Sequence, residues 1–210
     1  MIGLLDLQGG VVEHLDHLDR LGIAARRVKK AADLDGLSGL IIPGGESTCL
    51  GRLLRITGLD RTIVARHHAG LKLWGTCAGA ILLAQRVVGG EPCLALLDVA
   101  IQRNAFGSQM DSFNTLAMVP AVASTPIPLT YIRAPKISDL GAGVRSLLAV
   151  DDYHAAVEDD VILATVFHPE LTPSLAFHRY FAHKCGILTA DGDEAGWHPE
   201  DWTRYAPLPH

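Results

Sequence analysis

Residues 74–83 read W-G-T-C-A-G-A-I-L-L, and this stretch decides how the chain folds. The apolar run 71–74 predicts a short buried strand, and the composition of residues 78–85 predicts a helix. Almost no residues are left for a loop between them, so the chain must bend sharply where the strand passes into the helix. Cys77 lies at that bend.

The residues around the bend give Cys77 the features of a nucleophile. Gly75 and Gly79 flank it, where a strained turn and a closely packed helix leave no room for a β-carbon. The pattern G-x-C-x-G is the thiol form of the nucleophile elbow. A helix start favours the ionised thiolate, and the Ala78 N–H is placed to stabilise an oxyanion. An ordinary buried cysteine is the alternative, which the paired glycines make the weaker interpretation.

Length and composition describe one globular domain. The chain has 210 residues, of which 49% are hydrophobic and 20% charged, enough for one sizeable core. The net charge of −5, without a Lys/Arg-rich block, argues against a nucleic-acid partner. Four cysteines form no C-x-x-C pair and the histidine pairs lack a carboxylate cluster, so we expect no metal. Asp6 interrupts the first apolar run, so no signal peptide is expected, and reduced thiols indicate the cytoplasm.

Short apolar strands alternate with helices in the first part of the chain. We expect strands at 2–7, 23–28 and 39–42 and helices at 11–21 and 49–56, the first helix having its apolar residues at Val11, Leu15, Leu18 and Leu21. Strands separated by helices predict a mostly parallel sheet covered on both faces. Residues 115–132 carry no charge, but prolines interrupt them, so we expect strands joined by a proline-rich turn and no membrane span.

A glycine pair follows the third expected strand, in P-G-G-E-S-T at 43–48. Such a pair presents free backbone amides to a ligand. One interpretation is a phosphate cradle, although neither phosphate-binding glycine motif is present. Another is that the N–H of Gly45 completes an oxyanion hole opposite Ala78, since both loops lie at the carboxyl ends of their strands. A plain turn, with Ser47 or Thr48 capping the next helix, is compatible with either.

A second chemical motif follows the apolar strand expected at 161–167. It is His168-Pro169-Glu170, in which Pro169 disfavours the α conformation for His168. In an extended segment, residues i and i+2 point to the same side. Glu170 can therefore fix the tautomer and orientation of an imidazole that faces Cys77.

Together these motifs resemble those of class I, triad-type glutamine amidotransferases, most closely the branch of glutaminase subunits of pyridoxal 5′-phosphate synthases. The matching segments are L-D-L-Q-G-G-V-V-E-H near the start, P-G-G-E-S-T at 43–48, G-T-C-A-G at 75–79, R-N-A-F-G at 103–107, S-F at 112–113, I-R-A-P at 132–135 and F-H-P-E-L-T at 167–172. The resemblance covers about residues 1–187. It implies an α/β three-layer sandwich of the flavodoxin-like amidotransferase fold, with a mostly parallel, mixed central sheet. Residues 188–210 lie outside the pattern, as a flexible or surface-wrapped tail.

The resemblance also implies residue roles. Cys77 would be the nucleophile, His168 the acid/base and Glu170 the residue that orients it. The implied glutamine-binding residues are Gly45, Glu46, Ser47, Arg103, Ile132 and Arg133. Taken alone, the two arginines would be solvated surface residues. No cofactor or metal is implied.

The implied reaction is hydrolysis of L-glutamine to L-glutamate and ammonia through a thioester on Cys77. The ammonia would pass to a (β/α)-barrel synthase subunit in a large hetero-oligomer. Alternatives are a glutaminase subunit that feeds another acceptor, such as imidazole glycerol phosphate synthase, a different thiol hydrolase, and a non-catalytic regulatory subunit. The R-N-A-F-G and I-R-A-P segments favour the vitamin B6 branch, while Ser108 and the uncharged stretch 116–129 depart from its pattern.

Overall fold

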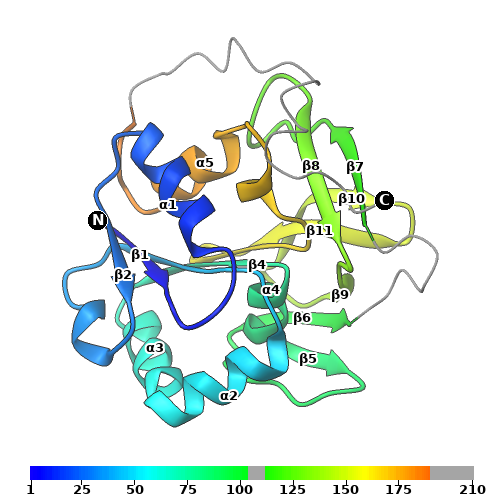
Figure 1. Ribbon diagram of the computed structural model, residues 1–210. Coiled ribbons are helices and arrows are strands. Elements are labelled where there is room, and N and C mark those ends of the chain that lie inside the picture. Colours follow the sequence, from blue (N-terminus) through cyan, green and yellow to red (C-terminus); the bar gives the residue numbers. More distant parts are fainter. Residues whose placement is uncertain (104–111, 190–210) are drawn as a thin grey trace.

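The computed structural model describes residues 1–103 and 112–189, and a mixed sheet lies between two layers of helices (Figure 1). Helices α1 (Val11–Arg20) and α5 (Ala176–Lys184) cover one face of the sheet. Helices α2 (Ser47–Thr57), α3 (Leu59–His68) and α4 (Ala78–Leu83) cover the other. The predicted three-layer α/β sandwich is confirmed.

The large sheet is parallel on one side and mixed on the other. Its order is β2 (Ala25–Val28), β1 (Ile2–Leu5), β3 (Gly39–Ile42), β4 (Lys72–Thr76), β12 (Ile162–Thr165), β11 (Tyr153–Glu158), β9 (Lys136–Leu140), β6 (Leu97–Gln102) and β5 (Ala84–Val88), with β10 (Arg145–Val150) paired to β11. Neighbours from β2 to β12 are parallel, as are β5 and β6. The pairs that β11 makes with β12, β9 and β10 are antiparallel, and so is the pair of β6 with β9.

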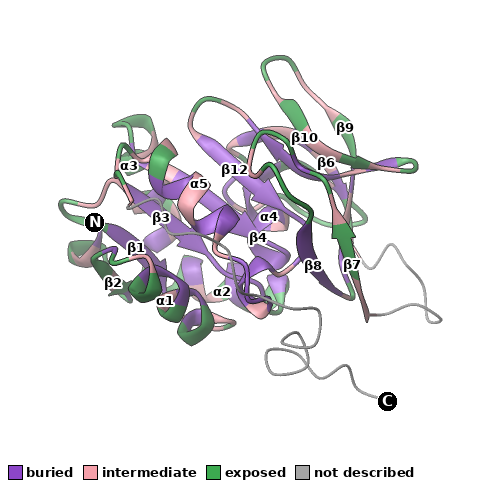
Figure 2. Cartoon of the chain, turned by 90° about the horizontal axis from the view of Figure 1, so that it is seen from above, coloured by how far each residue is buried: buried purple, intermediate pink, exposed green. Residues whose placement is uncertain are grey.

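A separate hairpin stands beside this sheet. It joins β7 (Ser112–Ala117) and β8 (Ile127–Ile132) in antiparallel register, so the predicted strands in the uncharged segment 115–132 are confirmed. The outward strand β7 has no fully buried residue, whereas β8 is buried from Ile127 to Tyr131 (Figure 2). The hairpin is tied to the main body where the His168 N–H donates to Thr130 O at 2.8 Å.

The central strands are mostly apolar because helices cover both of their faces. Every residue of β1, β3 and β12 is buried. Trp74 of β4 is fully buried, and its ring packs against Phe177 and Phe181 of α5. This packing fixes β4, the strand that carries the sharp bend, in the middle of the fold.

The predicted helix 78–85 is wrong at its end, because α4 stops at Leu83 and Gln85 belongs to β5. Ala84 is already extended, with φ −64° and ψ 139°. The carbonyls of Leu82 and Leu83 accept hydrogen bonds from the N–H groups of Leu94 and Leu96, both at 2.9 Å. Tertiary pairing therefore ends a segment whose own residues would continue as a helix.

The buried face of α1 also differs from the predicted apolar stripe. Its buried residues are Val11, His14, His17 and Leu18, whereas Leu15 is only half-buried. Two histidines thus occupy positions where helical spacing alone suggests apolar residues. Their partners belong to the site described below.

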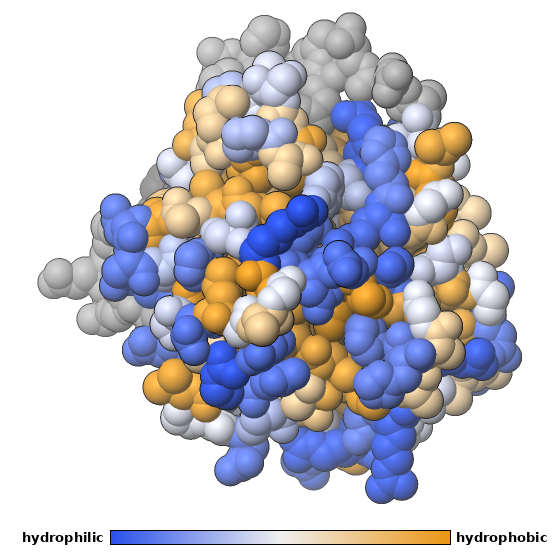
Figure 3. All heavy atoms as spheres, turned by 180° about the vertical axis from the view of Figure 1, so that it is seen from behind, coloured by the Kyte–Doolittle hydropathy of each residue, from blue (hydrophilic) through white to orange (hydrophobic). Residues whose placement is uncertain are grey.

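The surface opposite the view of Figure 1 interleaves hydrophilic and hydrophobic residues (Figure 3). Within residues 1–103 and 112–189, the helices are all too short or too polar to cross a bilayer.

Two glycines in helices test how tightly the fold is packed around α4. A β-carbon on Gly79 would lie 2.0 Å from Ile42 O, whereas one on Gly51 of α2 would meet side-chain atoms only at 3.4 Å or more. We expect Gly79→Ala to lower the free energy of unfolding by about 3 kcal/mol or more. Gly51→Ala should be neutral or stabilise by about 0.5–1 kcal/mol, since Ala is the better helix former. Urea denaturation measures both, and equal shifts would contradict the close approach of α4 to β3.

Candidate active site

Three strand ends converge at one edge of the sheet. Because β3, β4 and β12 are adjacent and parallel, their carboxyl ends lie side by side. Gly44 and Gly45 follow β3, Cys77 follows β4 directly, and His168 follows β12. Residues far apart in the chain are thus brought together without any long loop.

Cys77 occupies the sharp bend that the sequence predicts. Its backbone has φ 48° and ψ −104°, a conformation that costs energy for a residue with a β-carbon. The surrounding contacts hold it there: its N–H donates to Thr165 O at 2.8 Å. Gly75 and Gly79 are both required, because a β-carbon on Gly75 would lie 2.5 Å from the backbone of Gly79. The side chain is 8% exposed, enough to face a ligand.

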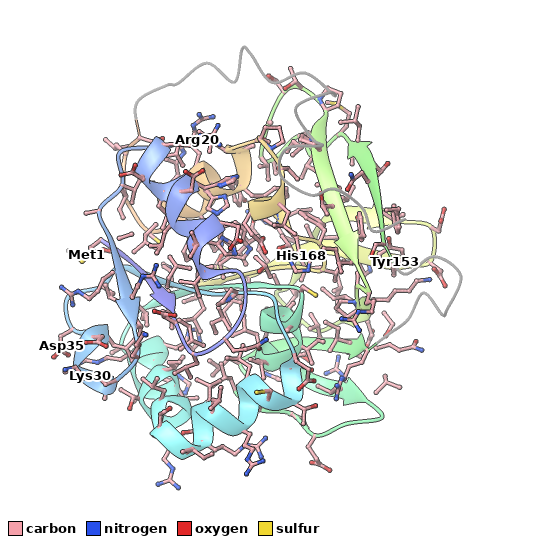
Figure 4. The ribbon with its side chains drawn as sticks, viewed as in Figure 1. Met1, Arg20, Lys30, Asp35, Tyr153 and His168 are labelled. Carbon is pink, nitrogen blue, oxygen red and sulfur yellow. The ribbon has the colours of Figure 1, made fainter. Side chains whose placement is uncertain are left out.

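His168 joins Cys77 to Glu170. Its Nδ1 donates to Glu170 Oε1 at 2.8 Å. Its ring also lies beside the Cys77 side chain, since one point, the place of a β-carbon on Gly44, is 2.4 Å from His168 Cε1 and 3.3 Å from Cys77 Cβ. Because the Nδ1 of His168 is bonded to Glu170, Nε2 is the ring nitrogen that is available to the Cys77 sulfur. Figure 4 shows His168 inside the molecule, where the central sheet meets β8. The structure therefore brings the three predicted catalytic residues together.

The backbone reason for the His168–Glu170 contact differs from the prediction. His168 is outside the α region, as expected before proline, but Pro169 begins a short 3₁₀ helix, η2 (Pro169–Leu171). Glu170 is therefore in a helical turn and not in an extended segment. The tight turn folds the carboxylate back toward the ring, so the contact forms by a different route.

Electrostatics favour an ion pair between His168 and Glu170. Burial alone would lower the pKa of His168, but the charge of Glu170 and the hydrogen bonds with Cys77 and Glu170 raise it well above its ordinary value. Burial opposes ionisation of Glu170 as well. The nearby His14 and His168 overcome this and lower the pKa of the carboxyl to about 2. The geometry thus supports a carboxylate that stabilises an imidazolium.

A cavity of about 430 Å³ opens in front of Cys77. Its walls are formed by Gln8, Gly45, Glu46, Ser47, Cys77, Ala78, Ile81, Arg103, Ile132, Arg133, Pro135 and His168. Every predicted site residue lines it except Glu170, which is 1% exposed and lies behind His168. Arg103 and Arg133 both line the cavity, and since Arg133 is exposed and Arg103 partly so, the solvated position that each suggests when considered alone is compatible with this placement.

The two predicted oxyanion-hole amides lie on the same cavity. Among the described residues, neither the Gly45 nor the Ala78 N–H donates to a protein acceptor, so both are free for a ligand. The neighbouring Gly44 N–H is held by Thr76 Oγ1 at 2.9 Å. Gly45 packs so closely on Gln8 that a β-carbon would lie 2.6 Å from Gln8 Oε1. The loop is therefore held in place on both sides of the Gly45 amide.

Polar groups of both signs stand at the cavity mouth. The Glu46 carboxylate caps α2, accepting from the Thr48 and Cys49 N–H groups at 2.9 and 2.6 Å, so Glu46 and not Ser47 or Thr48 is the cap. These hydrogen bonds lower the pKa of Glu46. Arg103 donates to Thr48 Oγ1 at 3.2 Å and lies 3.5 Å from Glu46 Oε1. The rest of the R-N-A-F-G segment lies outside the described residues.

Three residues that shape the site were not predicted from the sequence. Gly44 must be glycine, since a β-carbon would lie 2.4 Å from His168 Cε1 and 3.3 Å from Cys77 Cβ. The side chain of Gln8 accepts from the Glu46 N–H at 3.0 Å. His14 lies 3.4 Å from Glu170. The signal for His14 was present in its helical spacing from Val11 and Leu18, which places it on the buried face.

No three metal-ligating side chains are grouped closely enough to hold an ion in the part of the chain that the structure describes. The paired histidines His14 and His17 instead bond to neighbouring side chains and carbonyls. Burial lowers the pKa of His14 to about 4, so the ring is neutral at pH 7.

Comparison with known proteins places this geometry in context. The model of the SNO glutamine amidotransferase family matches residues 4–187. A protein of Syntrophus aciditrophicus (strain SB), named pyridoxal 5′-phosphate synthase subunit PdxT, is 55% identical over 98% of this chain and 94% of its own. A protein of the same name from Deinococcus radiodurans is 48% identical over 88% of this chain and 97% of its own.

Solved structures agree with this result. A crystal structure described as a glutamine amidotransferase superposes with a TM-score of 0.84 at 42% identity, over 89% of this chain and 99% of its own. The predicted amidotransferase fold is therefore confirmed. PurLQS from Thermotoga maritima, at 14% identity and a TM-score of 0.61, shares the fold alone.

The buried carboxylate makes stability depend on pH. The folded-state pKa of Glu170, about 2, is below its ordinary value of 4.5, so its stabilisation is present above pH 4.5 and is lost as the pH falls toward 2. Between pH 5 and pH 3, wild type should lose about 2 kcal/mol that the Glu170→Gln variant does not lose. Urea denaturation at the two pH values checks this, with the exposed Glu91→Gln as control. Parallel losses in wild type and Glu170→Gln would contradict the coupling.

Proposed function

The chain belongs to the SNO glutamine amidotransferase family, and we propose that it is the glutaminase subunit of a pyridoxal 5′-phosphate synthase. It hydrolyses L-glutamine to L-glutamate and ammonia. Residues 1–187 form the amidotransferase domain, and the tail expected at 188–210 lies, from residue 190 on, outside the described residues. The alignment with the Syntrophus relative covers 98% of the chain and so extends into this tail, which the family model does not reach.

The observation that carries the assignment is the contact series from Cys77 through His168 to Glu170 at the wall of a polar cavity. A thiol beside an imidazole that a buried carboxylate orients is the arrangement used for nucleophilic attack on carbonyl carbon. The free amides of Gly45 and Ala78 add the donors that an oxyanion needs.

Catalysis follows from these positions. His168 takes the Cys77 proton, and the thiolate attacks the side-chain amide carbon of glutamine. The carbonyl oxygen becomes an oxyanion that the Gly45 and Ala78 N–H groups stabilise; loss of one such donor typically costs about 3 kcal/mol of barrier. His168 then gives its proton to the leaving nitrogen, and ammonia departs from a glutamyl thioester. His168 takes a proton from water as the water attacks the thioester, and glutamate leaves as Cys77 recovers its proton.

The charges at the cavity mouth fit free glutamine. At neutral pH the amino acid carries an α-carboxylate and an α-ammonium group, and the cavity offers Arg103, Arg133 and Glu46. We assign the arginines to the carboxylate and Glu46 to the ammonium, with Ser47 and Ile132 completing the walls. A peptide substrate would lack one or both of these charges at its internal residues.

The partner is a synthase subunit, which is supported by the name of the relatives, pyridoxal 5′-phosphate synthase subunit PdxT. Ammonia released into water would be protonated and lost as a nucleophile, so it must pass directly to the acceptor. We infer that the acceptor is a (β/α)-barrel subunit that docks over the carboxyl edge of the sheet, in a large hetero-oligomer. The four unpaired cysteines suit a reducing compartment, and we place the complex in the cytoplasm.

The decisive test measures glutamate release by wild type and Cys77→Ala, each with and without the barrel synthase. Only wild type should release glutamate, and more rapidly with the synthase. Cys77→Ala should lose at least about 10³-fold in kcat, because no other group can form the thioester. Cys93→Ala is the matched control, a half-buried cysteine away from the cavity. Retained activity in Cys77→Ala, or full activity that ignores the synthase, would overturn the assignment.

Substrate recognition can be tested at Arg133. Removal of its charge in Arg133→Ala should raise KM for glutamine by roughly 10–100-fold and change kcat much less, since a charge-assisted hydrogen bond contributes about 1.5–3 kcal/mol. Arg66→Ala, which removes a surface ion pair with Asp35, is the control and should leave KM unchanged. Steady-state kinetics at saturating synthase distinguish the two, and an unchanged KM in Arg133→Ala would remove this residue from the binding site.

A further inference from the structure

A cluster of buried histidines lies directly behind Glu170. His14 and His17 of α1 and His178 of α5 are all fully buried, and their rings pack against one another and against Trp74. The reaction described above uses none of them. Burying a polar ring costs free energy unless its nitrogens form hydrogen bonds, so buried histidines call for an account of their partners.

The distances connect this cluster to the triad. Glu170 uses Oε1 for His168, and its other oxygen, Oε2, has no hydrogen bond among the described residues. His14 Nε2 lies 3.4 Å from this Oε2 and 3.4 Å from Thr76 Oγ1. On the other side of the ring, His14 Nδ1 lies 2.8 Å from His178 Nε2. Five side chains from Cys77 to His178 thus form one continuous series.

Only one tautomer fits these neighbours. His14 is neutral at pH 7, so it has a single N–H. With the proton on Nε2, the N–H lies toward both Thr76 Oγ1 and Glu170 Oε2, each 3.4 Å from Nε2, and His178 donates its own Nε2–H to His14 Nδ1. With the proton on Nδ1, a lone pair would face the carboxylate and His178 would carry a buried N–H on Nδ1, which has no partner among the described residues. A buried N–H without an acceptor and a lone pair that faces a carboxylate both cost free energy, so the tautomer with the proton on Nε2 is favoured.

We propose that His14 is a positioning residue, whose Nε2–H holds the free oxygen of Glu170, and that His178 sets its tautomer. This deepens the proposed glutaminase function and rests on it. The need arises each time His168 gives up its proton, because Glu170 then loses its cationic partner while almost fully buried. The His14 N–H dipole then helps the backbone hydrogen bond at Glu170 to keep the carboxylate ionised and aligned. Such contacts commonly tighten in the reacting complex.

The charged and titratable groups around the pair come from several elements. Glu170 on η2, His168 directly before η2, His17 on α1 and His178 on α5 all act on His14. Arg20, at the end of α1, acts on His178. His17 itself bonds to backbone carbonyls, with Nε2 2.9 Å from Thr172 O and Nδ1 3.0 Å from Glu13 O. It is as buried as His14, and both of its ring nitrogens bond to backbone carbonyls, although the charge of Glu170 also acts on it. His17 is therefore a matched control whose substitution leaves the His14 Nε2–Glu170 contact in place.

The test compares three variants: His14→Gln, His14→Asn and His17→Asn. A glutamine amide nitrogen can reach the place of Nε2, whereas an asparagine amide replaces only the Nδ1 side. The holocomplex with synthase is used, and kcat is expressed per active site labelled by a glutamine-analogue electrophile. In addition, the pH dependence of Cys77 alkylation by iodoacetamide is followed by mass spectrometry of its peptide, a readout that needs no turnover.

We expect His14→Asn to lower kcat per labelled site about 10–100-fold, the usual effect of losing an orienting partner, with KM within about twofold. Its midpoint for Cys77 alkylation should move to higher pH, because a misaligned Glu170 stabilises the imidazolium less. His14→Gln should recover most of the activity. His17→Asn should lower Tm without changing kcat or the midpoint. His14→Phe replaces His14→Asn if that variant folds poorly.

Two results would overturn the proposal. One is a His14→Asn enzyme with kcat within about twofold of wild type and an unshifted alkylation midpoint. The other is an equal loss in His14→Asn and His17→Asn, which would indicate general damage to the cluster. If wild type itself fails to hydrolyse glutamine, the proposed function fails, while the alkylation midpoints still decide whether His14 positions Glu170.

Discussion

The parallel alignment of β3, β4 and β12 is the constraint on which the site depends. Adjacent parallel strands must end at the same edge, so the loop after β3, the bend after β4 and the turn after β12 meet there. The spacing is so close that Gly44 can carry no β-carbon between His168 and Cys77. A shift of one residue in either strand pair would separate sulfur from imidazole, because register sets which side chains face each other.

The same packing makes a strained backbone and a buried charge tolerable. Cys77 holds a positive φ because the Thr165 carbonyl and the glycines around it leave no other path for the chain. Glu170 stays ionised at 1% exposure because hydrogen-bond donors and a cationic ring surround it. A buried carboxylate without such partners would take up a proton instead. Strain and charge are thus both concentrated at the reacting edge.

Local chemistry in the sequence was enough to predict much of this arrangement. The glycines around Cys77, the apolar run before His168 and the strand–helix alternation each depend on near neighbours, and the structure agrees with them. The early end of α4 could not be predicted, because it depends on hydrogen bonds from the Leu94 and Leu96 N–H groups, which lie further along the chain, to the last carbonyls of the helix. The helical spacing of His14 indicates that it is buried, but its contact with Glu170 could not be predicted, because the two residues are far apart in the chain. At Pro169 the predicted contact between His168 and Glu170 is present, but a 3₁₀ turn forms it and not the extended segment that was predicted.

The absence of a loop on either side of α4 limits how this part of the protein can vary in length. Strand β4 ends at Thr76, α4 runs from Ala78 to Leu83, and β5 begins at Ala84. Both flanking strands have fixed partners, β4 within the parallel half of the sheet and β5 with β6. An inserted or deleted residue between 72 and 88 would therefore rotate either the thiol or a sheet edge out of place. Indels among functional relatives should fall outside this segment, which makes it a reliable fixed point for aligning distant sequences.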